Sequence, residues 1–218
     1  MGGAGGPRRA DPMIANVDYG MGNRRSVEKA LARMGARPQI TDDHDVIRAA
    51  DGLVVPGVGA FPRAMANLAD LGLDDLLHER VAAGVPLLGV CLGLQLLFEE
   101  SVELGGGQGL GFLPGRVERL DAGARKLPHI GWNLVTFRRP SALTEGLPPA
   151  TPFYHVHSFA PVPAREEDVV GTSEYAGPFV SVVDRPPIYG VQFHPEKSSG
   201  AGLRLLENFA RICARVAA

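Results

Sequence analysis

Apolar residues in the first half of the chain alternate between short continuous runs and helical spacing. The pattern predicts strands over residues 13–18, 37–40, 52–59 and 85–90, and helices over residues 23–35, 44–50 and 63–83. The run VPLLGV at residues 85–90 is apolar throughout, as is typical of a parallel strand covered on both faces of a sheet. Gly35 can end the first helix, and a break in the last one is expected at Gly72. Repeated strand and helix units of this kind predict a parallel sheet.

From about Gly111 onward the pattern changes to shorter strands separated by proline and glycine. The strand candidates are GRVERL (115–120), NLVTF (133–137), PFYHVHSF (152–159), FVSVV (179–183) and IYGVQF (188–193). A last helix is predicted over residues 202–216, where apolar residues recur on one stripe. The sequence therefore predicts an α/β fold with a mixed, mainly parallel central sheet and flanking helices, more antiparallel in its second half.

The 218 residues are enough for one domain with a sizeable core, and no long linker divides them. We expect residues 1–12, MGGAGGPRRADP, to be a disordered extension and residues 13–218 to form the folded domain. The formal charge of −2 and the lack of a Lys/Arg run give no basis for binding nucleic acid or an anionic membrane. No apolar run reaches membrane-spanning length, and two cysteines are too few for a disulfide scaffold. We therefore expect a cytoplasmic protein with free thiols.

The stretch Gly89-Val90-Cys91-Leu92-Gly93 joins an apolar strand to a helix, which is the pattern of a nucleophile elbow. Glycines two residues before and after Cys91 remove side chains that would collide where the chain reverses sharply. The N–H groups at the start of the helix favour a thiolate and can hold an oxyanion. A buried structural cysteine fits the apolar run equally well, so this stretch alone leaves both interpretations open.

A second stretch, GVQFHPEKS at residues 190–198, supplies the groups that a thiol nucleophile needs. Pro195 favours an extended conformation at His194, and positions i and i+2 of an extended chain point to the same side. Glu196 can therefore reach the imidazole. A cysteine, a histidine and a carboxylate that orients it can make a thiolate and protonate a leaving amine. Without Cys91, a solvated turn before the last helix would be the favoured reading.

A third stretch, VVPGVGAF at residues 54–61, is a strand that ends in a glycine-rich loop. Backbone N–H groups in such a loop can bind a ligand, and open α/β sheets bind ligands along the edge where strands end. Most segments of this composition are only turns, so the signal is weak by itself.

Together, GVCLGLQ (89–95) and QFHPE (192–196) resemble the class I, triad-type glutamine amidotransferases. Within that family the chain is similar to the glutaminase subunits of imidazole glycerol phosphate synthase. The stretches that carry this resemblance, from about residue 14 to residue 209, are DYGMGNRRSV (18–27), PGVGAF (56–61), GLGFLPGRVERL (109–120), KLPHIGWN (126–133), FYHVHSF (153–159) and GVQFHPEKS (190–198). PGVG discriminates among relatives, because the anthranilate- and carbamoyl phosphate-type enzymes usually carry a GPG-type loop there.

The resemblance implies a Cys-His-Glu triad that hydrolyses glutamine. Cys91 would attack the side-chain amide to form a glutamyl thioester. His194 would take the thiol proton, give one to the departing ammonia and then activate water, while Glu196 orients His194. The resemblance implies no cofactor, and His78 and His129 have no ligand-type spacing with Cys or carboxylate, so we expect no metal.

The resemblance also implies which residues surround the thiol. The oxyanion would be held by the backbone N–H groups of Leu92 and Val58, the second of them once its peptide is suitably turned. Gly59, Gln95 and Tyr154 would help to bind glutamine.

The two glycines around Val58 lead to a hypothesis about control. Gly57 and Gly59 can change φ at little cost, so the Val58 N–H can be misdirected until the partner binds its own ligand.

The partner implied by the resemblance is a cyclase subunit with a (β/α)₈ barrel, in a heterodimer. Ammonia released into water would be protonated and lost, whereas this partner uses it to make imidazole glycerol phosphate and aminoimidazole carboxamide ribotide in histidine biosynthesis. Trp132 and Asn133 are the candidates for the interface, although a lone Trp is as often part of a core.

Two alternatives stay open: a glutaminase that serves another synthase, and a scaffold or regulatory module without catalysis. Two histidines also stay open. His155 stands where the family pattern leads us to expect an aromatic or aliphatic residue, which indicates a packed or a solvent-facing imidazole. His157 belongs to the VHS segment, with a role in substrate binding or in loop support.

Overall fold

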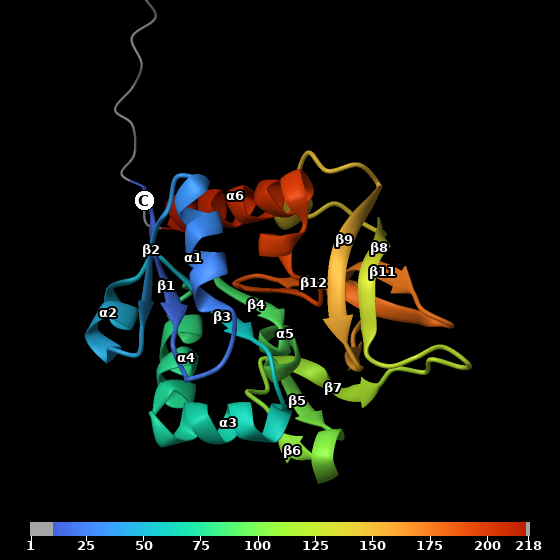
Figure 1. The fold of residues 1–218 in the computed structure, drawn as a ribbon. Helices are drawn as coiled ribbons and strands as arrows, with labels where there is room; N and C mark the ends of the chain where they lie inside the picture. Colours follow the sequence, from blue (N-terminus) through green and yellow to red (C-terminus); the bar gives the residue numbers. More distant parts are fainter. Residues whose placement is uncertain (1–10, 217–218) are drawn as a thin grey trace, which may run out of the picture.

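A nine-stranded sheet forms the centre of the molecule in the computed structural model, which describes residues 11–216 (Figure 1). Its strand order is β2-β1-β3-β4-β13-β12-β11-β8-β9. The strands are β1 (Met13–Val17), β2 (Arg37–Thr41), β3 (Gly52–Gly57), β4 (Leu87–Cys91), β8 (His129–Phe137), β9 (Ala150–His157), β11 (Val169–Glu174), β12 (Pro178–Arg185) and β13 (Ile188–Val191). Residues 1–10 of the predicted extension lie outside the described residues. The carbonyl groups of Asp11 and Pro12 accept hydrogen bonds from Arg37 in β2.

The direction of the strands changes across this sheet. Strands β2, β1, β3, β4 and β13 pair in parallel with their neighbours. From β13 onward, β12, β11, β8 and β9 pair antiparallel. The predicted mixed α/β sheet, parallel first and antiparallel later, is confirmed.

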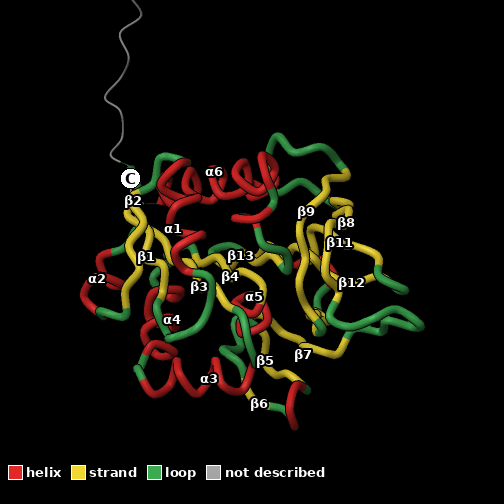
Figure 2. The backbone as a smooth tube through the Cα atoms, in the orientation of Figure 1, coloured by secondary structure: helices red, strands yellow, loops and turns green. Residues whose placement is uncertain are grey.

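A second sheet of four short strands packs below the first, in the order β10-β7-β5-β6 (Figure 2). It consists of β5 (Phe98–Ser101), β6 (Gly107–Gln108), β7 (Leu113–Arg119) and β10 (Phe159–Pro163). The sequence does not predict this sheet, because β6 has only two residues and β10 pairs with β7 from about forty positions further along the chain.

Helices cover both faces of the large sheet (Figure 1). They are α1 (Arg24–Arg33), α2 (His44–Ala49), α3 (Phe61–Asp70), α4 (Leu73–Ala82), α5 (Leu92–Leu96) and α6 (Ser199–Val216), with 3₁₀ turns η1 (Glu103–Gly105), η2 (Ala142–Thr144), η3 (Glu166–Asp168) and η4 (Pro195–Lys197). The predicted break falls at Gly72, whose φ is +61°, and the last helix begins three residues before the predicted start. Within residues 11–216, no helix has both the length and the apolar character to cross a membrane.

Neighbouring residues of each parallel strand enter different cores, because successive side chains of a strand point to opposite faces. Val54 of β3 and Leu88 of β4 pack with Phe209 of α6 in one core. Val55 and Leu87 pack with α3, α4 and α5 in the other. Burial on both faces explains why these strands are continuous apolar runs.

Candidate active site

The turn from β4 into α5 places Cys91 in a strained backbone conformation, with φ +56° and ψ −111°. The glycines on either side are required by close backbone contacts. A Cβ atom at Gly89 would lie 2.6 Å from the Gly93 carbonyl oxygen, and a Cβ atom at Gly93 would overlap the Val55 carbonyl oxygen. The helix therefore starts directly against β3, which is the sharp reversal that the elbow pattern predicts.

His194 and Glu196 follow β13, the strand that pairs with β4 on the side away from β3. His194 has extended φ and ψ values of −99° and 96°, and Pro195 opens the 3₁₀ turn η4. The Nδ1 atom of His194 lies 3.0 Å from Oε1 of Glu196, and both side chains are at least 95% buried. The spacing His-x-Glu thus brings a carboxylate to the imidazole within one turn.

The electrostatics around His194 favour the imidazolium. Burial opposes this charge and by itself lowers the pKa, but interactions with the side chains of Cys91 and Glu196 outweigh burial and raise the pKa of His194 to about 10. A proton on His194 is therefore available next to the sulfur atom. The Cys91 thiol also contacts the Val156 carbonyl oxygen at 3.6 Å.

Six of the residues predicted for the site line one cavity of about 280 Å³: Val58, Gly59, Cys91, Leu92, Gln95 and His194. They come from the end of β3, the elbow, α5 and the segment after β13. A cavity of this volume can hold a small ligand with a few polar groups.

Tyr154 does not line this cavity, although the family resemblance implies that it contacts glutamine. Its ring packs edge-on against Trp132, with centroids 6.1 Å apart. Its backbone carbonyl accepts a hydrogen bond of 2.9 Å from the His194 N–H, and its N–H donates to Ser198 Oγ. Tyr154 thus supports the backbone around His194, because β9 runs beside that segment.

The cavity is also lined by His157, whose role the sequence leaves open, and by two polar residues that the sequence does not indicate, Glu103 and Lys197. Glu103 lies on η1, and its Oε2 accepts a 2.9 Å hydrogen bond from the Phe61 N–H at the start of α3. In the sequence it belongs to a run of acidic residues typical of a solvated surface. Only the packing of the small sheet against α3 brings it to the cavity.

His157 belongs to a buried group of three histidines. Its Nδ1 lies 2.9 Å from the Phe159 carbonyl oxygen, and its Nε2 lies 3.1 Å from Nδ1 of His129. His155 is fully buried, with Nε2 3.3 Å from Ser181 Oγ, so it is the packed imidazole of the two alternatives. Burial lowers the pKa of His155 to about 2 and that of His157 to about 3.

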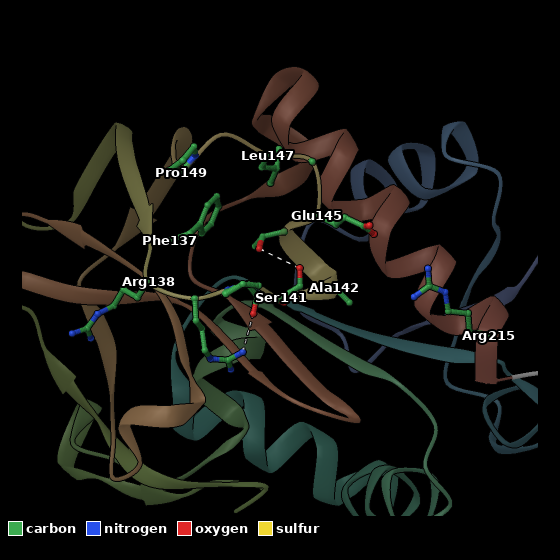
Figure 3. Close-up of a pocket in the computed structure, with 12 residues that line it drawn as sticks. Phe137, Arg138, Ser141, Ala142, Glu145, Leu147, Pro149 and Arg215 are labelled. Carbon is green, nitrogen blue, oxygen red and sulfur yellow. Dashed lines mark hydrogen bonds between the residues drawn. The ribbon is translucent and has the colours of Figure 1, made fainter.

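Figure 3 shows a larger cavity, of about 750 Å³, between the end of β8, η2 and the last turn of α6. Two of its three arginines already have partners: Arg138 pairs with Glu166, and Arg139 donates to the carbonyl groups of Glu167 and Asp184. Its described lining contains no cysteine or histidine. The nucleophile and its base therefore lie in the smaller cavity.

The outer face of β8 exposes a row of large apolar side chains. Ile130, Trp132 and Leu134 are 60, 54 and 55% exposed. Trp132 is thus a surface residue and not part of the core. Asn133 points to the opposite face, where its side chain donates 2.8 Å to the Glu174 carbonyl oxygen, because adjacent residues of a strand alternate.

Comparison with known proteins agrees with this geometry. The profile of the family described as Glutamine amidotransferase class-I matches residues 15–213. A solved structure described as a glutamine amidotransferase has a TM-score of 0.70 at 23% identity, over 91% of this chain and 98% of that one, which shows a shared fold. The chain belongs to the class I glutamine amidotransferase family, as the sequence motifs predict.

Within this family the curated relatives are more specific. The imidazole glycerol phosphate synthase subunit HisH of Moorella thermoacetica is 55% identical over 199 residues, which cover 91% of this chain and 94% of the relative. The subunit of the same name from Desulfitobacterium hafniense strain Y51 is 47% identical over the same shares. The particular relatives of this chain are therefore HisH subunits.

Proposed function

We propose that this protein is the glutaminase subunit of imidazole glycerol phosphate synthase. It hydrolyses glutamine to glutamate and ammonia and passes the ammonia to a cyclase subunit, in a cytoplasmic heterodimer of histidine biosynthesis. The observation that carries the proposal is that Cys91 and His194 line one cavity and that Glu196 contacts the His194 ring from behind, in a chain 55% identical to a HisH subunit.

In the first step, the Cys91 thiolate attacks the side-chain carbonyl carbon of glutamine, so that a C–S bond forms and the carbonyl oxygen becomes an oxyanion. The C–N bond then breaks, and ammonia leaves with the proton that His194 donates. Glu196 fixes the orientation of the ring and compensates its positive charge. The raised pKa of His194 supports this role, because the imidazolium is the form that can donate.

In the second step, His194 removes a proton from water, which attacks the thioester carbon. The C–S bond breaks, glutamate leaves and the thiolate is restored. In both steps the oxyanion is held by the N–H groups of Leu92, the first residue of α5, and of Val58. The position of both residues at the cavity supports this assignment.

Glutamine binding uses Gln95 and Gly59, and we add Glu103. The substrate carries an α-ammonium group, and Glu103 is the one carboxylate among the described residues that line the cavity. One of its oxygen atoms holds the start of α3, which leaves the other for the ammonium. We do not assign Tyr154 a direct contact, because its side chain packs on Trp132.

The cyclase would dock on the apolar row Ile130, Trp132 and Leu134. Exposed apolar side chains on one strand face are typical of an interface, and Trp is frequent among residues that dominate binding. Asn133 would support β8 from its other face, where it is bonded to Glu174.

The test is glutamate release from glutamine by the purified chain, alone and with a cyclase subunit plus its nucleotide ligand. We expect release that rises steeply with the liganded partner. Cys91→Ala should abolish glutamine-dependent synthesis, a loss of at least about 10³-fold, and leave the partner able to use ammonium salts. Loss of the ammonia-dependent reaction as well would contradict this division of labour.

The same experiment separates the alternatives. Stimulation by a synthase that is not a cyclase barrel would indicate a glutaminase with another partner. The scaffold alternative predicts little release in any combination, with Cys91 alkylated by iodoacetamide no faster than Cys213. Cys213 is a suitable reference, because burial raises the pKa of its thiol.

A further inference from the structure

The loop after β1 packs directly on the segment that carries Val58. Tyr19, in the DYGMGN stretch, is fully buried, and its hydroxyl donates a 2.5 Å hydrogen bond to the Pro56 carbonyl oxygen. Pro56 and Val58 are two residues apart, at the end of β3. The family resemblance implies no role for Tyr19 in the reaction.

The loop that holds Tyr19 is itself fixed at several points. The Asn67 side chain of α3 donates 2.9 Å to the Tyr19 carbonyl oxygen. Asp18 accepts the Gly20 N–H and pairs with Arg24. Hydrogen bonds therefore fix both the main chain and the side chain of Tyr19.

Gly57 lies between the Tyr19 side chain and the elbow. A Cβ atom there would be 2.6 Å from the Tyr19 hydroxyl oxygen and 2.8 Å from Cβ of Leu92. Gly57 is thus required for space, which differs from the flexible-hinge hypothesis drawn from the sequence. The peptide that can still rotate is the one after Val58, because Gly59 has φ +118°, a value that glycine adopts easily.

We propose that Tyr19 is a positioning residue for the glutaminase reaction. Its hydroxyl holds the Pro56 carbonyl and so keeps the Val58 N–H in reach of the oxyanion. Without the hydroxyl, a buried carbonyl loses its partner and the end of β3 gains freedom, so the oxyanion is held less well. The inference rests on the proposed function, since it assumes that Val58 is an oxyanion donor.

The test is Tyr19→Phe in the complex with the cyclase and its nucleotide ligand, with Tyr189→Phe as the matched control. Tyr189 is also buried, but it packs against Phe209 in the core on the other face of the sheet. We expect kcat for glutamate release to fall about tenfold in Tyr19→Phe, with KM for glutamine within twofold, and the control to match wild type.

A second readout separates positioning from a general loss of structure. Glutamate γ-semialdehyde adds to the Cys91 thiol as a hemithioacetal, whose oxyanion occupies the hole, whereas alkylation by iodoacetamide forms no such oxyanion. Tyr19→Phe should weaken inhibition by the aldehyde about tenfold and leave the alkylation rate of Cys91 unchanged. The inference would be overturned by an unchanged kcat. It would also be overturned if inhibition by the aldehyde and the alkylation rate of Cys91 fell by the same factor.

If Tyr19→Phe does not fold, Asn67→Ala decides, because it releases the same loop through the Tyr19 main chain. A joint fall in kcat and in aldehyde affinity supports the inference, and no change in either overturns it. A wild-type complex that releases no glutamate contradicts the proposed function instead, so the two failures are distinguishable.

Discussion

The two halves of the large sheet differ in the contacts that their residues make on the faces of the sheet. In the parallel half, α5 touches β3 and β4 through backbone atoms, with Gly89 and Gly93 at the contacts. In the antiparallel half, the contacts of interest are between side chains: β8 and β9 contribute a buried group of histidines, and β8 exposes apolar residues. A nucleophile on an elbow depends on backbone contacts that no side chain can replace, whereas a docking face can be adjusted residue by residue.

The proposed triad lies where these halves meet. Strand β13 is parallel to β4 and antiparallel to β12, so His194 follows a strand that belongs to both. Changes in the parallel half should therefore affect folding and catalysis together. Changes in the antiparallel half should affect partner binding or pH response separately.

The largest effect is expected at Gly93, in the parallel half. Gly93→Ala places a Cβ atom on the Val55 carbonyl oxygen, which should lower the free energy of unfolding by about 3 kcal/mol and remove glutamate release. Gly177→Ala, between β11 and β12, is the matched control, because its Cβ atom would meet nothing within 4 Å. Urea denaturation gives the free energy of unfolding of both variants. Equal losses in Gly93→Ala and Gly177→Ala would show that close backbone contacts do not distinguish the two halves.

The next effect is expected at Trp132, in the antiparallel half. Trp132→Ala should weaken binding of the cyclase about 30-fold or more, since exposed Trp residues often dominate an interface. The free energy of unfolding should change by less than about 0.5 kcal/mol. Titration calorimetry against the cyclase gives the affinity, and Val162→Ala, also an exposed apolar residue, is the control. A similar loss of affinity in both variants would contradict the docking face on β8.

The last prediction concerns pH. His155 and His157 have folded-state pKa values of about 2 and about 3, lowered by burial, against about 6.5 in the unfolded chain. Below pH 6.5 the unfolded state binds protons that the folded state does not, so stability is present above this pH. It should be lost as pH falls, by up to about 1.4 kcal/mol per pH unit for each histidine.

His155→Phe tests this directly, because it removes one of the three histidines whose pKa is lowered, the third being His129, and keeps an aromatic ring between Phe179 and Phe193. Urea denaturation between pH 7 and pH 5 should show that the free energy of unfolding depends less steeply on pH than in wild type, by up to about 1.4 kcal/mol per pH unit. An unchanged slope would mean that His155 does not contribute to the pH dependence.

Predictions from sequence succeeded where the signal was local. Continuous apolar runs identified the parallel strands, Gly72 marked the break between α3 and α4, and the spacing His-x-Glu placed a carboxylate on the imidazole. Each depends on backbone geometry within a few residues. The small sheet escaped prediction because its strands are short and distant in sequence.

Local sequence therefore determined the class of fold, the elbow and the identity of the cysteine, the histidine and the carboxylate that contacts it, since backbone periodicity and fixed spacings constrain them. Only the packing of distant segments decided that Glu103 reaches the cavity, that Tyr154 faces Trp132, and that the Tyr19 hydroxyl holds Pro56. Contacts between residues more than about twenty positions apart arise from how sheets and helices pack together, and no local pattern specifies them.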